Sequence, residues 1–547
     1  MGVDLVDITA KRAALTPHRV AFEDALSGRT LTYAELDERA ARCAGALAAM
    51  GVGREDRVAV LCRNRIEFFE IMFACGKLGA ILAPLNWRAP AAELVLLLDD
   101  CTPKVLLFGA EDAACAGALA RDGLALVGLD SSVYGGGAKR SEAEGDVRTP
   151  PSVSLRVTAH LQAGEHYAGE DAGSPYESLL AAHEPLQTDA RWAGDAVWSL
   201  SYTSGTTGAP KGVMQTQQMA AVNAFHVAQA FGVRSGDVTL NYLPLFHTAG
   251  IQLVTLPTLI AGGTVVVLPA FDEARALALM ARLDVFFGVP AVYQQMALNP
   301  AFEDADLSRV RAWGCGGAPL SDVLVERYAA KGVRVCNGYG MTETGPTAFV
   351  AAPEDALEKI GSVGKPQMLL EVRIVDAKGR DVAVGETGEI WMRGPGLTPG
   401  YWRRPEETAK AFTAGGWLKS GDIGRRDADG CYYVAGRFKE MYISGGENVY
   451  PAEVENVLAR HPAVLEAAII GVPDEKWGEV GHAFVLLRPG AAPITAAEVI
   501  QFCRVQLAGY KTPRHVSFVD EFPRTPAGKI RKHMLAPAPA VAVRRRG

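Results

Sequence analysis

Short apolar runs alternate with longer segments of mixed polarity through most of the chain. The β-branched runs at 57–62 and 81–86 have the length of buried strands, and the segment 66–80 between them has the length of a helix. Alternating strands and helices are typical of α/β layers. We therefore expect a large α/β region. The pattern is also compatible with two α/β subdomains within it. The strand-like pattern returns at 104–109, 196–204, 238–244, 264–269 and 285–290.

The amino-acid composition changes at two places along the chain. Residues 131–175 are rich in Gly, Ser and charged side chains, which predicts an inserted surface loop. A compact α+β pattern begins after the glycine and mixed charge of 436–446. It contains helices predicted at 452–461 and 495–507 and strands predicted at 463–472, 482–489 and 515–520. The predicted organisation is an N-terminal domain at 1–434, a hinge at 435–439, and a C-terminal domain at 440–547 with a flexible tail at 535–547.

Composition adds limits to this picture. A chain of 547 residues with 49% hydrophobic and 21% charged side chains is too long for one ordinary core. A net charge of -7 gives no electrostatic basis for binding nucleic acid. The nine cysteines have no metal-ligand spacing, and the first residues lack the pattern of a signal peptide, so we expect a reducing, cytoplasmic location. The sequence leaves a homodimer open.

One uncharged run needs separate treatment because its length would span a bilayer. Residues 251–270 hold twenty positions without a charge. Pro257 and the pair Gly262-Gly263 interrupt the run. We therefore predict a short apolar helix followed by a Val-rich buried strand, and no transmembrane segment.

The stretch YTSGTTGAPKG at 202–212 is the first candidate for chemistry. Its glycines expose backbone N–H groups, and its hydroxyl side chains and Lys211 can contact phosphate oxygens. A strand-like segment precedes it and a helical pattern from residue 214 follows, which predicts a phosphate-binding turn between strand and helix. It is not a Walker A loop, because Ala209 and Pro210 separate Gly208 from Lys211 and a glycine follows the lysine.

Further motifs follow in order along nearly the whole chain. They are TSGTTGAPKGV, YLPLFHTAG at 242–250, GGAP at 316–319, NGYGMTET at 337–344, SGDIG at 420–424, GRFKEMYISGGENVYPAEVE at 436–455 and PRTPAGKI at 523–530. Together they resemble the adenylate-forming ANL superfamily, which includes the AMP-forming acyl-CoA synthetases, and they are most similar to the motifs of bacterial ligases for fatty and aryl acids. The resemblance implies the ANL fold, with a small mobile C-terminal domain, and implies ATP, Mg²⁺ and coenzyme A as ligands.

Joining a carboxylate to AMP brings two anions together, so such a site must supply cations and oriented donors. The resemblance implies that Lys529 bridges the carboxylate and the α-phosphate, and that Glu343 holds Mg²⁺. Asp422 would accept hydrogen bonds from the ribose. The catalytic set is Lys529, Lys211, Glu343 and His247. The residues implied in ATP or AMP binding are Thr203, Ser204, Gly205, Thr206, Thr207, Gly208, Lys211, Gly317, Asn337, Gly338, Tyr339, Thr342, Asp422, Arg437 and Lys529.

The acceptor side is also assigned by resemblance. Lys439 matches the hinge position, about which the small domain rotates between an adenylating and a thioester-forming pose. Gly445 and Gly446 would then let the pantetheine arm of CoA approach the backbone closely. An ordinary turn would explain the same glycine pair.

The acyl pocket is expected to take an uncharged tail. Peptide-synthetase adenylation domains carry an Asp just after the motif that corresponds to YLPLFHTAG. This chain has FHTAGIQL there, without an acidic side chain. Small residues at 249, 250, 314 and 340 are expected to leave room for a chain or a ring. The predicted lining is His247, Thr248, Ala249, Gly250, Ile251, Trp313, Gly314, Gly340 and Met341.

The leading hypothesis is therefore an AMP-forming carboxylic acid–CoA ligase, an acid–thiol ligase that forms an acyl-adenylate and then a thioester. Fatty or other aliphatic acids are slightly favoured over aromatic acids of the benzoate, cinnamate or ferulate kind. Two alternatives stay open: transfer of the acyl group to the phosphopantetheine arm of a carrier protein, and a catalytically silent sensor of an acyl ligand or AMP.

Overall fold

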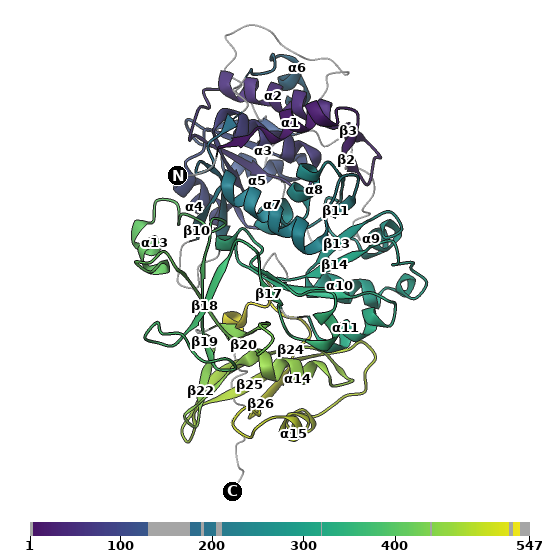
Figure 1. Ribbon diagram of the computed structural model, residues 1–547, viewed down its shortest axis with the longest axis vertical. Coiled ribbons are helices and arrows are strands. Elements are labelled where there is room, and N and C mark those ends of the chain that lie inside the picture. Colours follow the sequence, from purple (N-terminus) through teal and green to yellow (C-terminus); the bar gives the residue numbers. More distant parts are fainter. Residues whose placement is uncertain are drawn as a thin grey trace, which may run out of the picture. The chain divides into compact units, whose positions relative to one another are not determined.

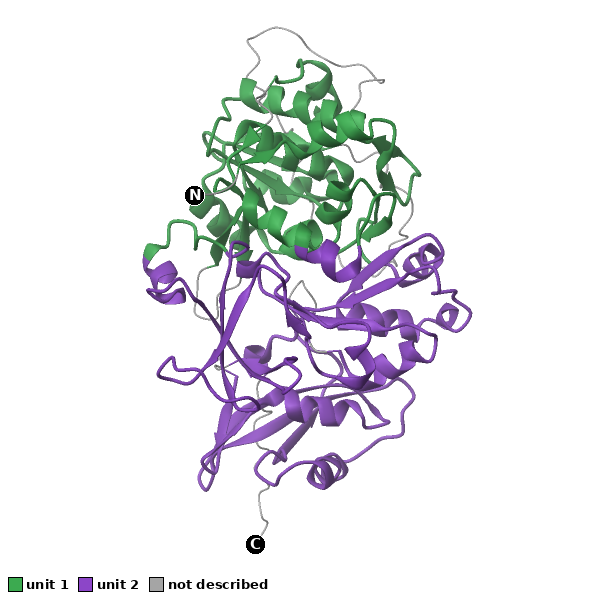
Figure 2. Ribbon diagram, viewed as in Figure 1, with its two compact units in different colours: residues 1–225, 233–271, 398–405 green, residues 226–232, 272–397, 406–547 purple. Residues whose placement is uncertain are grey.

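The computed structural model describes most of the chain, and its described residues form two compact units (Figure 2). Unit 1 contains residues 1–225, 233–271 and 398–405, and unit 2 contains residues 226–232, 272–397 and 406–547. Strands alternate with helices in both units, which confirms the predicted α/β class (Figure 1). The described residues are 4–129, 175–187, 191–203, 210–318, 320–437, 440–524 and 529–535.

Unit 1 contains a six-stranded sheet in the order β10-β9-β5-β4-β6-β7. All neighbouring strands are parallel except β10, which runs antiparallel to β9. Strands buried on both faces are typical of parallel sheets, and the apolar runs of the sequence follow that pattern. The strands are β4 (Arg57–Leu61), β5 (Ile81–Pro84), β6 (Val105–Phe108), β7 (Ala125–Gly128), β9 (Val197–Thr203) and β10 (Lys211–Thr216).

The segment after the glycine-rich stretch differs from the prediction. The sequence predicted a helix from residue 214, whereas residues 211–216 form β10, and α7 (Gln217–Phe231) begins only afterwards. Lys211 pairs with Thr203 and Gly212 with Tyr202, so residues 204–210 connect two antiparallel strands. The expected strand-to-helix turn is therefore wrong, and no helix N-terminus directly follows Lys211.

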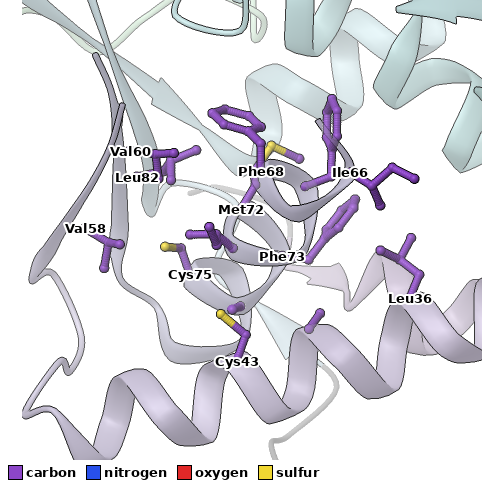
Figure 3. Packing of buried hydrophobic residues seen from close by; sticks show 14 of the residues in the cluster. Leu36, Cys43, Val58, Val60, Ile66, Phe68, Met72, Phe73, Cys75 and Leu82 are labelled. Carbon is purple, nitrogen blue, oxygen red and sulfur yellow. The ribbon is translucent and has the colours of Figure 1, made fainter. Parts of the chain in front are cut away.

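Helix α3 (Ile66–Leu78) lies between the sheet and α2 (Tyr33–Ala49). Because α3 is apolar around most of its circumference, it is buried on all sides. Figure 3 shows Met72 on the side of strand residues Val58 and Leu82, and Phe73 on the side of α2. A capping box of Thr32 and Glu35 starts α2.

The other elements of unit 1 include a second group of paired strands in the order β11-β12-β2-β3. The uncharged run at 251–270 contains α8 (Thr255–Ala261) and β12 (Thr264–Val267), as predicted. The other described elements are β1 (Leu5–Val6), β2 (Val20–Asp24), β3 (Thr30–Thr32), β8 (Arg191–Trp192), β11 (Val238–Asn241), α1 (Ile8–Leu15), α4 (Ala91–Cys101), α5 (Ala113–Ala118) and α6 (Pro175–Ala181).

Unit 2 carries three groups of strands. The first has the order β13-β14-β15-β16-β17, in which the first three strands are parallel. The second is the antiparallel group β18-β19-β20-β21. These strands are β13 (Val285–Gly288), β14 (Ala312–Cys315), β15 (Val335–Tyr339), β16 (Phe349–Val350), β17 (Lys365–Pro366), β18 (Glu371–Val375), β19 (Thr387–Arg393), β20 (Leu418–Arg426) and β21 (Tyr432–Arg437). The helices along this part are α9 (Glu273–Leu279), α10 (Pro290–Leu298), α11 (Asp322–Ala329), α12 (Asp355–Glu358) and α13 (Pro405–Ala411).

The third group matches the α+β pattern predicted for the C-terminal region. Its order is β23-β22-β25-β24, and β26 pairs with β25. The ring of Tyr442 lies across two facing glycines, Gly471 and Gly481, where a Cβ would come within 2.4 Å and 2.5 Å of Tyr442 atoms. The elements are β22 (Tyr442–Ser444), β23 (Glu447–Val449), β24 (Val464–Asp474), β25 (Gly478–Leu487), β26 (His515–Phe518), α14 (Pro451–Ala459) and α15 (Ala496–Gln506).

The predicted boundaries stay predictions. The proposed hinge at 435–439 overlaps the end of β21, and its residue Lys439 lies outside the described residues. The predicted insertion at 131–175 and the tail at 535–547 also lie outside them, except for Pro175 and Leu535. In the part of the chain that the structure describes, no helix combines the length and apolar character that a membrane crossing needs.

Candidate active site

The connection from β15 to β16 carries Glu343. It contains a single 3-10 turn, Thr342–Thr344. A hydrogen bond of 3.0 Å from the Met341 N–H to Thr344 Oγ1 closes this turn. The chain doubles back so tightly that a Cβ on Gly340 would lie 1.6 Å from the carbonyl oxygen of Pro346. The absent side chain of Gly340 therefore permits this close approach of the chain to itself, and the predicted place of Gly340 in the acyl pocket stays a prediction.

Glu343 is 7% exposed on this turn. Among the described residues, no group of three or more His, Cys, Asp or Glu side chains is arranged to hold a metal by itself. Mg²⁺ in nucleotide sites takes one or two carboxylates together with substrate phosphates. A single carboxylate in a tight loop fits that requirement, and Thr342 lies beside it in the chain.

A residue that the sequence did not identify anchors the same loop. His226, on α7, is buried, and its Nε2 accepts a hydrogen bond from the Leu369 N–H at 3.2 Å. Burial lowers the pKa of His226, and a hydrogen bond with the Thr347 backbone acts in the opposite direction. The neutral ring thus ties the Glu343 loop to residue 369. A lone histidine on an apolar helix gave no signal of this role.

Asp422 lies at the centre of a polar cluster on β20. It is 6% exposed and accepts a hydrogen bond from the Tyr339 hydroxyl at 2.5 Å. Arg437 stands opposite it on β21, with 3.4 Å between Nε and Oδ1. Burial raises the pKa of Asp422, although Arg437, Tyr339 and Lys529 act to lower it. Burial and the neighbouring Asp422 also raise the pKa of Tyr339, which keeps its hydroxyl a donor.

Lys529 reaches the same cluster from the C-terminal end of the chain. A Cβ on Gly317 would lie 3.9 Å from its Cε. Lys529 is exposed to solvent. Desolvation by the surrounding protein and, as the next cause, the charge of Arg437 lower the pKa of its ammonium group, while Asp422 and Glu440 act to raise it. The structure therefore brings together Gly317, Tyr339, Asp422, Arg437 and Lys529.

Asn337 offers a hydrogen-bonding atom beside this cluster. Its Nδ2 donates to the Ser362 carbonyl at 3.3 Å, and its buried Oδ1 has no hydrogen-bond partner within the described ranges. Gly338 comes next on β15, where a Cβ would lie 3.0 Å from the Phe349 carbonyl oxygen. A free amide oxygen at this position can accept a hydrogen bond from an amino group such as that of adenine.

Lys211 lies in unit 1, as the first residue of β10. Its Nζ is 5.3 Å from the centre of the Tyr401 ring, on a segment that pairs with β10 through Val213 and Tyr401. The Thr203 hydroxyl lies 3.5 Å from the Lys211 carbonyl oxygen. The other predicted phosphate contacts, Ser204, Gly205, Thr206, Thr207 and Gly208, lie outside the described residues.

The predicted pocket segment 247–251 lies in unit 1 and is held by buried polar side chains that the sequence did not identify. Asn241 Nδ2 donates to the Gly250 carbonyl at 2.7 Å, and Asn64 Nδ2 donates to Asn241 Oδ1 at 2.8 Å. A Cβ on Gly250 would lie 2.4 Å from the Pro244 carbonyl oxygen, so this glycine also serves packing. Thr248 and Ile251 are buried, His247 and Ala249 are partly buried, and the His247 ring contacts Phe246.

Trp313 and Gly314 point to opposite faces of β14, as neighbours on a strand do. Trp313 is 2% exposed and packs among the rings of Phe286, Tyr293 and Tyr328. Trp313 is therefore part of the core in this structure, and its predicted place in the acyl pocket stays a prediction. On the other face, a Cβ on Gly314 would lie 2.5 Å from Phe287 and 2.8 Å from Phe231. Aromatic side chains already occupy the room that this glycine was expected to leave.

Gly445 and Gly446 form the two-residue turn of the β22–β23 hairpin. Both have positive φ, 62° and 87°, which such a turn requires and glycine adopts without strain. A Cβ on Gly445 would also lie 2.7 Å from Trp477. The hairpin accounts for the pair, so these glycines alone give no separate support for a CoA contact.

Comparison with known proteins identifies the family. A family model described as AMP-binding enzyme matches residues 9–402, and the model of the AMP-binding enzyme C-terminal domain matches residues 453–529. The chain belongs to the AMP-binding enzyme family. Enzymes of this adenylate-forming family use ATP, typically with Mg²⁺, and the relatives named below use CoA as co-substrate.

Several relatives are acid–CoA ligases. Feruloyl-CoA synthase of Amycolatopsis sp. is 41% identical over 95% of this chain and 96% of its own length. The long-chain-fatty-acid–CoA ligase FadD13 of Mycobacterium tuberculosis is 35% identical over 96% of each chain. The o-succinylbenzoate CoA synthetase of Bacillus subtilis, solved with its acyl-adenylate, aligns with a TM-score of 0.82 and 31% identity over 98% of this chain and 99% of its own. The chain is an AMP-forming acid–thiol ligase with the ANL fold.

Proposed function

We propose that this AMP-binding family member activates a hydrophobic monocarboxylic acid in two steps. In the first, a carboxylate oxygen attacks the α-phosphorus of ATP, the bond to the β-phosphate breaks, and pyrophosphate leaves. In the second, the CoA thiolate attacks the acyl carbon and AMP leaves with the electron pair of the broken bond. The first step needs cationic and hydrogen-bonding groups around two anions.

The observation that carries the proposal is the approach of Lys529 to Gly317, Asp422 and Arg437 within unit 2. A lysine at this place can compensate the charge of the carboxylate and the α-phosphate together. Asp422 would accept from the ribose hydroxyls, and Glu343 would hold Mg²⁺ against the phosphates. The other assigned contacts are Asn337, Gly338, Gly317 and Tyr339 toward adenine, Thr342 and Arg437 toward the nucleotide, and Thr203 to Gly208 with Lys211 toward the leaving phosphates.

The division of labour is tested by separating the two half-reactions. Lys529→Ala should abolish acid-dependent ATP–pyrophosphate exchange, while thioester formation from supplied acyl-adenylate largely survives. The reason is that we assign Lys529 to charge compensation at the phosphorus and give it no role in the attack on the acyl carbon. Loss of both half-reactions to the same extent, in a variant with an unchanged melting temperature, contradicts this assignment.

The acid belongs to one of two classes. The first is a fatty or other aliphatic acid, supported by the absence of an acid side chain in 246–253 and by similarity to the long-chain ligase. The second is an aromatic acid, supported by the 41% identity to feruloyl-CoA synthase. A screen of AMP release with CoA present, comparing saturated acids of several lengths with benzoate, cinnamate and ferulate, decides by the ratio of kcat/KM values.

The acceptor and its binding site belong to the same proposal. Free CoA is the acceptor that we propose, with Lys439 at the hinge and Gly445 and Gly446 near the pantetheine arm. Parallel assays with free CoA and with a phosphopantetheinylated carrier protein distinguish the two acceptors. A chain that only senses acyl ligands or AMP would release no AMP with any acid.

A further inference from the structure

A second lysine holds the segment that carries Lys529. The described residues 529–535 contain the short turn Lys532–Met534. From this turn, Lys532 Nζ lies 2.7 Å from Glu455 Oε1 and 3.4 Å from Glu440 Oε2. The Lys532 side chain is 18% exposed and the Glu455 side chain 21%, so this ion pair is largely withdrawn from water, whereas Glu440 is exposed. Burial lowers the pKa of Lys532, but the two carboxylates more than offset it and the pKa is raised.

Glu455 is itself fixed by the small domain. It projects from α14, and its Oε1 also accepts a hydrogen bond from the Ile469 N–H of β24 at 2.8 Å. The carboxylate is thereby oriented by a helix and a strand before it meets Lys532. Lys532 is thus bound to a rigid anchor.

The rest of the segment is attached by backbone and apolar contacts. Ile530 forms a bridge with Arg524, and the Arg531 N–H donates to the Pro523 carbonyl at 2.7 Å. Ile530 and Leu535 pack against the cluster of Ala468, Phe484 and Phe522. These contacts hold the segment on the sheet. The ion pairs of Lys532 add two charged contacts on the C-terminal side of Lys529.

Glu440 links this network to the cluster around Asp422. Its charge acts on Lys529 and on Asp422, and it also contacts Lys532. It follows directly on the predicted hinge at 435–439. The two lysines therefore share one acidic neighbour, although only Lys529 approaches Gly317.

We propose that Lys532, through Glu455 and Glu440, is a positioning residue that holds Lys529 at the bond-forming centre of the adenylation step. This inference rests on the role proposed above for Lys529. Removing Lys532 leaves the partly buried carboxylate of Glu455 without its compensating charge, so the segment that carries Lys529 shifts or loosens. A displacement of about 1 Å of a reacting group costs on the order of 100-fold in rate.

The test measures acid-dependent ATP–pyrophosphate exchange in the full-length enzyme. We expect Lys532→Ala to lower the kcat of exchange at least about tenfold. The KM for ATP should stay nearly unchanged, because Lys532 touches no nucleotide contact. Thioester formation from supplied acyl-adenylate should also stay near the wild-type rate. Lys532→Arg keeps the charge and should restore part of the exchange rate.

Two further variants keep the test interpretable. Glu455→Gln retains an acceptor for the Ile469 N–H and removes only the charge, so it should lower exchange in the same selective way. Lys511→Ala breaks a comparable ion pair on α14, where Lys511 Nζ lies 2.6 Å from Glu453 Oε1, and should leave exchange at the wild-type rate.

The outcomes separate this inference from the proposed function. If Lys529→Ala abolishes exchange and Lys532→Ala leaves it intact, the positioning role is wrong and the function of Lys529 stands. If Lys532→Ala and Glu455→Gln lower both half-reactions equally together with the melting temperature, Lys532 is only structural. If the wild-type enzyme shows no exchange with any acid, the proposed function and the inference fail together.

Discussion

At the residue scale, three glycines of the predicted acyl-pocket lining lie directly against other parts of the protein. Gly340, Gly250 and Gly314 each face a protein atom within 2.5 Å of the place where a Cβ would lie. A protein interior is packed as densely as an organic crystal, so these contacts leave no space for a side chain. Close approach of neighbouring segments is therefore a sufficient reason for glycine at these three positions.

Gly340→Ala should disable adenylation because its Cβ would overlap the Pro346 carbonyl oxygen, at 1.6 Å, and the Glu343 loop must move. We expect ATP–pyrophosphate exchange to fall by about 100-fold or more. Gly509→Ala is the matched control, since no described heavy atom lies within 4 Å of its Cβ and its φ is ordinary. Exchange in Gly340→Ala at the rate of the Gly509→Ala control contradicts this account.

The sequence predicted the nature of these residues better than their surroundings. Residue type identified Asp422, Glu343 and Lys529 as candidates only together with a family resemblance, because each alone resembles a solvated side chain. Nothing in the sequence indicates which atoms fill the space beside a glycine or which face of β14 holds Trp313. Those facts depend on contacts between distant segments.

At the element scale, long apolar runs were predicted well and short polar strands were not. The runs that became β4, β6 and β12 are mostly apolar and buried, so burial fixes them as strands. β10 has the sequence KGVMQT, whose polar residues continue into the helical pattern of α7, and its pairing with β9 decided its conformation. The β22–β23 hairpin was not predicted, because its strands have only three residues each.

In the small domain, the Tyr442 side chain packs against Gly471 and Gly481, and substitutions at these three positions test this packing. The Tyr442 hydroxyl is buried and has no hydrogen-bond partner among the described residues. Because an unsatisfied buried hydroxyl costs free energy, Tyr442→Phe should be neutral or stabilising. Gly481→Ala places a Cβ 2.5 Å from that hydroxyl oxygen and should destabilise the domain by about 1–3 kcal/mol.

The double variant Tyr442→Phe/Gly481→Ala should then recover much of the loss, because the phenyl ring lacks the clashing oxygen. Gly471→Ala is the control, since its Cβ would meet Tyr442 Cβ at 2.4 Å and phenylalanine keeps that atom. Hydrogen exchange of the β24 and β25 amides reports the local stability. Equal destabilisation of Gly481→Ala with and without the tyrosine hydroxyl would exclude the clash as the cause.

At the scale of the whole molecule, the cluster around Asp422, our proposed adenylating centre, draws on residues from distant parts of the chain. Asp422 and Arg437 come from neighbouring strands, whereas Lys529 comes from the last described segment. The placement of Lys529 near Gly317 suits the first half-reaction. We propose from the family resemblance that the second half-reaction needs the small domain to rotate about Lys439, so a hinge substitution should affect the two half-reactions differently.

Lys439→Pro should separate them. Proline fixes φ near −65° and also restricts the residue before it, so rotation at this position is opposed. Because Lys529 already lies at the adenylating centre, we expect ATP–pyrophosphate exchange to stay near the wild-type rate. Overall acyl-CoA formation should fall by at least about tenfold, which corresponds to about 1.4 kcal/mol in the barrier.

Lys439→Ala provides the contrast, because it removes the side chain and leaves the backbone free to rotate. Its acyl-CoA formation should therefore exceed that of Lys439→Pro even if the ammonium group itself contributes. Measuring exchange and acyl-CoA release on the same preparations distinguishes a blocked rotation from a damaged centre, since only the latter lowers exchange. Normal acyl-CoA release by Lys439→Pro would place the pivot elsewhere in the chain, because a rotation about residue 439 cannot proceed with its φ held fixed.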